Sequence, residues 1–382
     1  MKRITNHLCN GCMACYNACP FDAIFIEFDK EGFYIPVINN EKCKECGKCE
    51  KVCPLNKDYK IECNYKKLYA AQNKSDKERE KASSGGVFPL IAKFIWDRNG
   101  IVYGVAYDDN FEIKHFRQES PTDIFYGSKY VQSYIGKIYQ LVKEDLDNNK
   151  LVLFSGTPCQ VNGLISYLGR KYNNLVTIDF ICHGVPSPMI WNKYKDELVK
   201  KYGKDIIIDF RSKLVNWNAF SFTVCRKHDG KILYANTLTE DPYLKVFLRN
   251  FNLRLSCSNC HFKGVNDRCD FTIGDFWGVE NYYREYNEGK GTSVMFCNTD
   301  RSISIVDEIM DKIRLTEIND YTELLSGNPT LIQSQVLPKG RTDFFYEVLK
   351  KEDIIKVFEK YSKDPLIKRI KRRIRNLINK LK

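Results

Sequence analysis

The 382-residue chain has only five histidines and no run of 18 apolar residues. So few imidazoles argue against zinc or haem sites built on several histidines. Without a long apolar run no transmembrane helix is expected, and the first residues lack the apolar stretch of a secretory signal. No nucleophile–histidine–aspartate arrangement or phosphate-transfer motif occurs, which disfavours hydrolase and kinase functions. Together with the length, these absences predict a cytoplasmic globular protein of two or three domains.

Cysteine is abundant by comparison, with 16 copies. The reducing cytoplasm keeps thiols free, so structural disulfides are not the expected use of so many cysteines. Metal ligation is the natural alternative, because thiolates bind iron and zinc tightly. The spacing of the cysteines then indicates which metal they suit.

Two identical patterns, C-x2-C-x2-C-x3-C-P, lie 34 residues apart near the N-terminus. The first consists of Cys9, Cys12, Cys15 and Cys19, and the second of Cys43, Cys46, Cys49 and Cys53. This duplicated spacing is typical of two-cluster bacterial ferredoxins, in which the fourth cysteine of each run ligates the other cluster. We therefore expect one 4Fe–4S cluster on Cys9, Cys12, Cys15 and Cys53, and a second on Cys43, Cys46, Cys49 and Cys19. Zinc sites instead use paired C-x2-C hooks with a long spacer.

After a polar linker that contains a lone Cys63, short apolar runs alternate with longer amphipathic stretches. This alternation predicts a mixed α/β domain behind an α+β ferredoxin-like module, residues 1–58. Strands are expected near residues 68–72, 101–107, 151–155, 176–181, 206–210, 220–226 and 271–274. Helices are expected near residues 87–97, 136–148, 160–171, 188–202 and 242–250.

Two cysteines follow apolar strands of this α/β pattern. Cys159 stands where a helix begins, and Cys182 follows the next strand, just before His183. A helix N-terminus lowers the pKa of a thiol, and ligands gather outside the carboxyl ends of parallel strands. The two cysteines predict one shared site, although each alone also fits a buried structural cysteine. His183 is more typical of a capping or core residue than of a catalytic one.

A C-x2-C pair, Cys257 and Cys260, is placed to complete this site. With Cys159 and Cys182 it supplies four thiolates, enough for a third 4Fe–4S cluster. Cys269 is a competing candidate for the fourth ligand position of this site. Zinc on the same cysteines is the alternative, because a closed site of four thiolates suits either metal.

A Ser83-Ser84-Gly85-Gly86 turn precedes an apolar helix. Such a turn suits a phosphate or pyrophosphate, because free backbone amides point out at the positive end of the helix dipole. The same residues are also typical of a plain helix cap. The turn alone therefore leaves both interpretations open.

Taken together, these motifs resemble the family of coenzyme F420 hydrogenase and dehydrogenase beta subunits. The resemblance is carried by residues 83–88, 127–133, 156–160, 182–187 and 257–278. It implies a non-covalently bound FAD beside a 4Fe–4S cluster on Cys159, Cys182, Cys257 and Cys260. Many members carry a small residue at the position of Cys269, which is therefore not expected to be a ligand. The family domain would span residues 59–150 and 151–350, followed by a basic helix over residues 351–382.

The resemblance also implies where the flavin makes contact. The expected residues are Ser84, Gly85, Gly86, Lys129, Tyr130, Gln132, Ser133, Thr157 and Gln160. Lys129 is expected at the electron-rich edge of the flavin, where its charge stabilises the reduced, anionic form. Catalytic residues are not assigned.

The implied function is that of an iron–sulfur flavoprotein oxidoreductase. FAD would exchange two electrons with an unidentified organic substrate or coenzyme and single electrons with the clusters. A ferredoxin, or a reductase- or hydrogenase-type subunit, is the expected redox partner. No motif indicates that coenzyme F420 itself is the substrate. The alternatives are an electron-transfer subunit without catalysis of its own and a redox sensor.

The net charge of +12 is concentrated in the C-terminal tail. Between Leu366 and Lys382 there are eight basic residues and no acidic ones. The rest of the chain carries only about +4, which does not predict a nucleic-acid-binding face. Asp364 and Pro365 predict the start of a cationic amphipathic helix. Such a helix fits a peripheral position at an anionic inner-membrane surface, or packing on the body with a solvated basic face.

Overall fold

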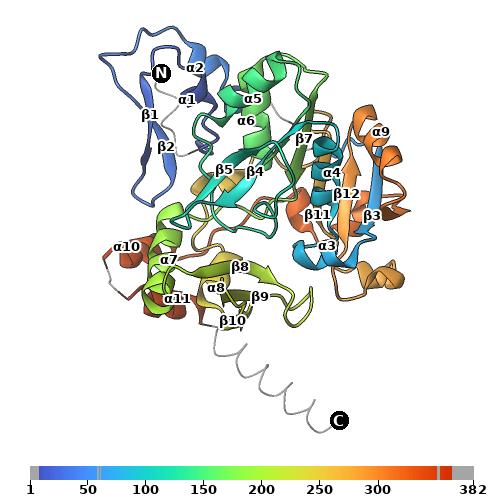
Figure 1. Cartoon of the computed structure of the whole chain (residues 1–382). Coiled ribbons are helices and arrows are strands. Elements are labelled where there is room, and N and C mark those ends of the chain that lie inside the picture. The colour runs from blue at the N-terminus through green and yellow to red at the C-terminus, as the bar shows by residue number, and fades with distance from the viewer. Residues whose placement is uncertain (1–7, 58–59, 61, 351–352, 364–382) are drawn as a thin grey trace.

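The computed structural model describes residues 8–57, 60, 62–350 and 353–363. An N-terminal module, residues 8–57, lies against a larger α/β body (Figure 1). The module combines an antiparallel pair of strands with two short helices. Its elements are α1 (Ala14–Ala18), β1 (Ile24–Phe28), β2 (Tyr34–Ile38) and α2 (Lys48–Lys51).

An eight-stranded mixed sheet forms the centre of the body. Its strand order is β13-β3-β12-β11-β7-β6-β4-β5, and the neighbours from β11 to β4 run parallel to one another. The strands are β3 (Lys67–Asn73), β4 (Ile101–Tyr107), β5 (Ile113–Gln118), β6 (Val152–Ser155), β7 (Leu175–Phe180), β11 (Phe271–Asp275), β12 (Ser293–Cys297) and β13 (Ile313–Glu317). All four residues of β6 are buried, as expected for a parallel strand covered on both faces.

Helices cover both faces of this sheet, because successive side chains along each strand point to opposite sides. On β4, Val102 packs with α4 and α9, whereas Ile101 and Tyr103 pack with α5 and α6. The helices are α3 (Asp76–Lys81), α4 (Val87–Trp96), α5 (Ile138–Asp147), α6 (Pro158–Leu168) and α9 (Asp300–Glu308). The result is a three-layer α/β arrangement with the N-terminal module beside α5 and α6 (Figure 1).

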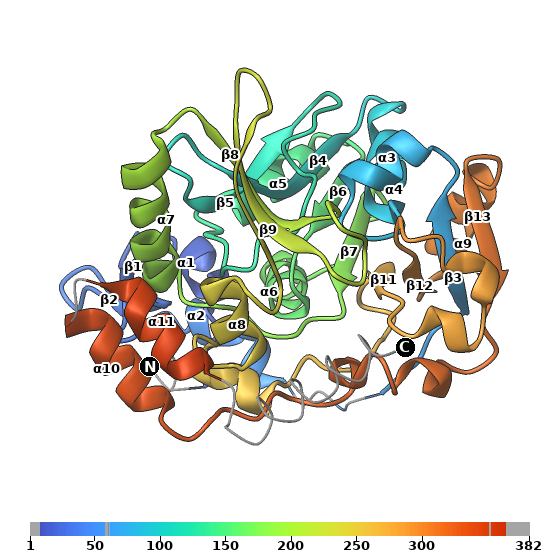
Figure 2. The ribbon, with the colours of Figure 1, turned by 90° about the horizontal axis from the view of Figure 1, so that it is seen from below.

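A smaller antiparallel sheet and four helices complete the body (Figure 2). Its strands are β8 (Ile206–Ser212), β9 (Ser221–Arg226) and β10 (Ile232–Thr237). Its helices are α7 (Pro188–Tyr202), α8 (Pro242–Leu248), α10 (Arg341–Lys350) and α11 (Ile354–Ser362). Aromatic side chains fill the space between them, with Trp191, Tyr194 and Phe210 almost fully buried.

The prediction of a mixed α/β body is confirmed, and the expected helix over residues 188–202 coincides with α7. Pro188 at the first helical position and the Ser187 cap explain why this helix was easy to place. Strands β12 and β13 join the central sheet from a region for which no element was expected. Of the basic helix predicted over residues 351–382, residues 353–363 are described and contain α11, which ends at Ser362. Residues 364–382, which hold the expected amphipathic segment, lie outside the described residues. Among the described residues, no helix combines the length and apolarity needed to cross a membrane.

Arg254 fastens the N-terminal module to the body. Its guanidinium donates hydrogen bonds to the carbonyl oxygens of Cys9 and Tyr34 at 2.7 and 3.1 Å, and to Gln132 Oε1 at 3.0 Å. A second tie is the two-pronged ion pair between Arg341 and Glu31. Since Arg254 is only 4% exposed, its bonds to the module are shielded from water.

Replacing Arg254 by methionine should loosen this attachment. The change leaves buried carbonyl oxygens without a donor, which should cost about 2–4 kcal/mol of stability. Limited proteolysis and denaturant unfolding would measure it, with Arg284→Met, an exposed arginine, as the matched control. Equal stability and equal protease resistance in the two variants would contradict the docking role of Arg254.

Candidate metal centres

The eight cysteines of the N-terminal module are sorted into two pockets. The middle pocket, with about 570 Å³ of empty volume, is lined by Cys9, Cys12, Cys15 and Cys53. The outer pocket, with about 820 Å³, is lined by Cys19, Cys43, Cys46 and Cys49. These are the two crossed sets that the spacing predicted as ligands. Each pocket offers four thiols, a donor set that fits a 4Fe–4S cluster.

The backbone around the two pockets repeats with the sequence. Left-handed φ angles occur at Gly11 and Met13, and at Glu45 and Gly47, which are the equivalent positions of the two patterns. These turns bring amides toward sulfur, as in the 3.4 Å hydrogen bond from the Gly11 amide to Cys9 Sγ. Hydrogen bonds to sulfur stabilise the negative charge of a thiolate cluster.

Burial and neighbouring thiols raise the pKa of Cys15, the neighbours being Cys9, Cys53 and Cys49. Burial likewise raises the pKa of Cys12. A buried thiolate is costly without a nearby positive charge, which bound iron supplies. The influence of Cys49 on Cys15 also shows that the outer and middle pockets are neighbours, and both residues belong to one small apolar cluster.

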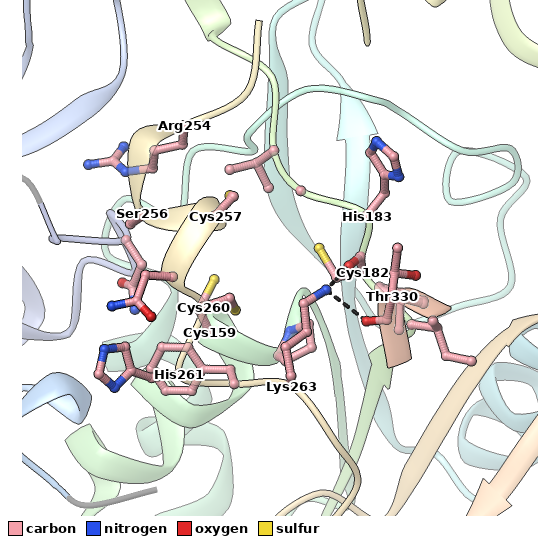
Figure 3. Close-up of a pocket in the computed structure, with 18 of the residues that line it drawn as sticks. Cys159, Cys182, His183, Arg254, Ser256, Cys257, Cys260, His261, Lys263 and Thr330 are labelled. Carbon is pink, nitrogen blue, oxygen red and sulfur yellow. Dashed lines mark hydrogen bonds between the residues drawn. The ribbon is translucent and has the colours of Figure 1, made fainter. Parts of the chain in front are cut away.

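The body pocket brings together Cys159, Cys182, Cys257 and Cys260 from three segments of the chain (Figure 3). Cys159 lies in the first turn of α6, whose N-terminus is fixed by a capping box between Thr157 and Gln160. Cys182 follows the carboxyl end of β7, and Cys257 lies in a short 3₁₀ helix (Leu255–Asn259) that ends at Cys260. The cavity has about 680 Å³ of empty volume.

The thiols of the body pocket are close enough to affect one another's pKa values. Burial raises the pKa of Cys159, and the Cys182 and Cys260 thiols raise it further. Burial raises the pKa of Cys182 to about 12, against the opposing effect of the Lys263 ammonium. Among the described residues no three ligating side chains are close enough to hold a single metal ion. The donor set of four thiols around a cavity fits a 4Fe–4S cluster.

Cys269 lies apart from this pocket. It is buried in the core, and its Sγ donates a hydrogen bond to the Phe271 carbonyl oxygen at 3.1 Å. His183 lines the pocket, but its Nε2 lies 2.7 Å from Asn250 Oδ1, and its ring packs edge-on against Phe247. A structural role for His183 accounts for these contacts.

The body and middle pockets adjoin each other. Asn10 and Leu55 line both cavities. Gly163 of α6, one helical turn after Cys159, lies against the module, and a Cβ there would stand 2.9 Å from Cys12 Cβ and 3.0 Å from Cys12 Sγ. Helix α6 therefore carries a ligand candidate of one pocket and touches a ligand candidate of the next.

The residues expected to contact flavin fall into two groups. In the first, the Ser83–Gly86 turn meets the Gly127–Tyr130 segment through a 2.8 Å hydrogen bond between Ser83 and Ser128. Within this group, Ser84 Oγ donates to the Thr292 carbonyl oxygen, and the Gly85 amide donates to Ser293 Oγ. Gly86 has a φ of 78° and caps α4. Tyr130 stacks on Phe247 with ring centroids 4.6 Å apart.

The second group takes part in hydrogen bonds inside the protein. Gln132 donates to the Asn10 carbonyl oxygen and accepts from Arg254. Gln160 Nε2 donates to Ser133 Oγ at 3.0 Å, and Thr157 belongs to the α6 cap. These side chains link the module and α6 to the segment that precedes α5, a role that the sequence alone did not indicate.

Cations gather around the first group. Burial lowers the pKa of Lys129 to about 7, and its ammonium donates to the carbonyl oxygens of Ile124 and Tyr126. Lys213, whose pKa is also lowered by burial to about 7, donates to the Ser84 carbonyl oxygen. Arg211 is paired with Asp275, but its Nε and Nη2 have no hydrogen-bond partner among the described residues. A buried cation with unmet donors fits an anionic group such as a flavin phosphate or pyrimidine edge.

Sequence reasoning missed three residues that shape these sites. Gly163, Arg254 and Lys263 matter because of what folding places beside them. Only the position of Lys263, three residues after Cys260, hinted at a link to the body pocket.

Comparison with known proteins identifies two regions of the chain. Residues 149–321 match the family model for the C-terminal part of the beta subunit of coenzyme F420 hydrogenase/dehydrogenase. Residues 8–57 match the model of a 4Fe-4S dicluster domain.

Two curated relatives and a solved structure are among the proteins that resemble the chain. One subunit of the F420H2 dehydrogenase of Methanosarcina mazei is 23% identical over 222 residues, which cover 53% of this chain and 62% of that protein. The chain thus spans less than two thirds of this relative. An uncharacterized ferredoxin from Methanocaldococcus jannaschii is 43% identical over 49 residues, or 12% of this chain and 73% of that protein. A chain of the F420-reducing [NiFe] hydrogenase complex from Methanosarcina barkeri gives a TM-score of 0.44 at 13% identity, covering 76% of this chain and 92% of that one.

Substituting alanine for Gly163 tests the contact between α6 and Cys12. Inside an ordinary helix this change stabilises by about 0.5–1 kcal/mol. Here the new Cβ would crowd Cys12, so we expect a loss of about 1–3 kcal/mol instead. Denaturant unfolding gives the sign, and Ser166→Ala on the same helix, which removes a hydroxyl without a partner among the described residues, is the near-neutral control. Stabilisation by Gly163→Ala would contradict the close approach.

Proposed function

Because the chain belongs to the family of coenzyme F420 hydrogenase/dehydrogenase beta subunits and carries a 4Fe-4S dicluster domain, we propose that it is an iron–sulfur flavoprotein oxidoreductase. In this proposal three 4Fe–4S clusters connect an external one-electron partner with a FAD in the body. The organic substrate or coenzyme that the FAD serves is not specified by the residues at hand.

The observation that carries the proposal is the series of three neighbouring pockets with four cysteines each. Outer and middle pockets share the cluster around Cys15 and Cys49, and middle and body pockets share Asn10 and Leu55. Twelve of the 16 cysteines are used in this way. Clusters in such a series would exchange single electrons, and a bound FAD would exchange two with an organic partner.

The protein's own residues would control where a redox partner and water reach the clusters, and how far the module lies from the body pocket. Cys46 is exposed, so the outer pocket is the natural point of contact for a redox partner. Cys12 and Cys15 are buried, which keeps water away from the middle pocket. Arg254 and Gly163 hold the module at a fixed distance from Cys159.

FAD is assigned to the turn at Ser84, Gly85 and Gly86 and to Lys129 and Tyr130. The support is the cationic surroundings of this turn, in which Arg211 is buried and Lys129 and Lys213 are half-buried. Their charges would hold the negative groups of the flavin and favour its reduced, anionic state. Gln132, Ser133 and Gln160 would act indirectly, through the hydrogen bonds that position α6.

A second candidate is an electron-transfer subunit that holds clusters without flavin. It is favoured by the internal hydrogen bonds of Gln132, Ser133 and Gln160, which occupy side chains expected at the flavin. The name of the Methanosarcina mazei relative, a dehydrogenase subunit, also fits a chain that works with partner subunits.

Metal content tests the three-pocket arrangement. Anaerobically purified protein should hold about 12 irons per chain, and a Cys182→Ala/Cys260→Ala variant about 8, because the module keeps its own ligand sets. Cys225→Ala, a half-buried cysteine outside all three pockets, should retain the native iron content. About 8 irons and one zinc in the native protein would instead assign the body pocket to zinc.

Flavin content tests the second half of the proposal. Lys129→Met should lower the FAD retained per chain by about tenfold or more, because a buried charged contact is worth about 1.5–3 kcal/mol. Iron content should stay native, which reports that the body is folded. Lys150→Met, an exposed lysine, is the control. Native protein with a full set of irons and no flavin would favour the second candidate.

A further inference from the structure

The three pockets differ in the charge of the residues that line them. In the body pocket Arg254 and Lys263 are unopposed, since none of the lining residues is Asp or Glu. The residues that line the middle pocket are uncharged. In the outer pocket Lys44 and Lys48 are matched by two glutamates, Glu45 and Glu50.

Lys263 is built into the wall of the body pocket. Its ammonium donates to the carbonyl oxygens of Cys182 and Thr330 at 2.6 and 2.8 Å, as the dashed lines of Figure 3 show. The residue is 7% exposed, so its charge is poorly screened by water. Both acceptors are neutral, and among the described residues no carboxylate forms an ion pair with Lys263.

The charge of Lys263 reaches the thiols of the pocket. Its ammonium is hydrogen-bonded to the backbone of one candidate ligand, Cys182, and Lys263 stands three residues after another, Cys260. A carboxyl lies behind one residue of the pocket wall, Thr272, which donates to Asp179 Oδ1. Burial raises the pKa of Asp179 to about 7, so its negative charge is only partly developed at neutral pH.

We propose that Lys263 raises the reduction potential of the cluster in the body pocket and makes it the most easily reduced of the three. Reduction adds one negative charge to a cluster and its thiolates, and a buried cation beside them stabilises that charge. Solvent exposure favours reduction in the outer pocket as well, but the cations there are offset by Glu45 and Glu50. No charged residue lines the middle pocket, and the nearby Arg254 guanidinium is bonded to the backbone of Cys9 and Tyr34 and to Gln132.

This difference in reduction potential would favour electron transfer from the outer pocket toward the body pocket. A low-potential one-electron donor that docks at the outer pocket would give up one electron, and Lys263 would favour its residence at the four body cysteines, were a cluster bound there. Lys263 would thus act through its charge, which stabilises the reduced state, and not as a ligand of iron. The inference rests on the proposed function, because it requires a 4Fe–4S cluster on the four body cysteines.

Redox titration followed by electron paramagnetic resonance (EPR) tests the inference on the full-length protein. In the native protein the body cluster should be the first to be reduced as the potential is lowered. In Lys263→Gln and Lys263→Met its midpoint should shift to more negative potential, whereas Lys263→Arg should stay near the native value. The two module clusters should not move in any variant. Lys195→Met removes a buried lysine of α7 away from the pockets and should leave all three midpoints unchanged.

The outcomes separate this inference from the proposed function. A native protein without a third cluster overturns both. A third cluster that is reduced after the module clusters overturns the inference alone, even if the neutral variants fail to assemble. A midpoint that is the same in Lys263→Gln as in the native protein also overturns it.

Discussion

The close approach of helix α6 to the N-terminal module is the contact on which the arrangement of the sites depends. A side chain larger than hydrogen at Gly163 would collide with Cys12, so the helix can lie this near only because a glycine stands there. One turn earlier the same helix presents Cys159 to the body pocket. A rigid element therefore spans two ligand sets, and Arg254 secures the module on the other side with three buried hydrogen bonds. Because protein interiors are closely packed, these contacts fix the distance between the body pocket and the middle pocket.

Burial imposes the second constraint. Thiols taken out of water resist ionisation, as the raised pKa values of Cys12, Cys159 and Cys182 show. Positive charge has to be supplied where thiolates are to form; bound iron would supply it in each pocket, and Lys263 adds to it in the body. The same reasoning applies to the cationic surroundings of the Ser83–Gly86 turn, where the ammonium groups of Lys129 and Lys213 donate hydrogen bonds to carbonyl oxygens. The charges of Lys129, Lys213 and Lys263 thus lie at the candidate binding sites and are not spread over the protein surface.

The sequence predicted the module's cysteine sets because their spacing is local and duplicated, and the structure places the two crossed sets in separate pockets. It also predicted the mixed α/β body, since buried parallel strands such as β6 appear as continuous apolar runs. It did not predict β12 and β13, which pair with β3 across more than 200 residues of chain. The roles of Gly163 and Lys263 were not predicted from the sequence for a related reason. Their importance lies in a neighbour brought near by folding, and no local pattern records that neighbour. The expected flavin residues were drawn from a resemblance, which could not distinguish direct contacts from the hydrogen bonds of Gln132, Ser133 and Gln160.

The most direct test of a continuous series of three clusters is low-temperature EPR spectroscopy of the anaerobically purified, fully reduced protein. The account predicts about three unpaired spins per chain, with the spectrum of the third cluster broadened by magnetic interaction with its neighbour in the middle pocket. A spectrum that accounts for only two spins would contradict the third cluster. A sharp third signal that simply adds to that of the module would contradict the contact between the body and middle pockets.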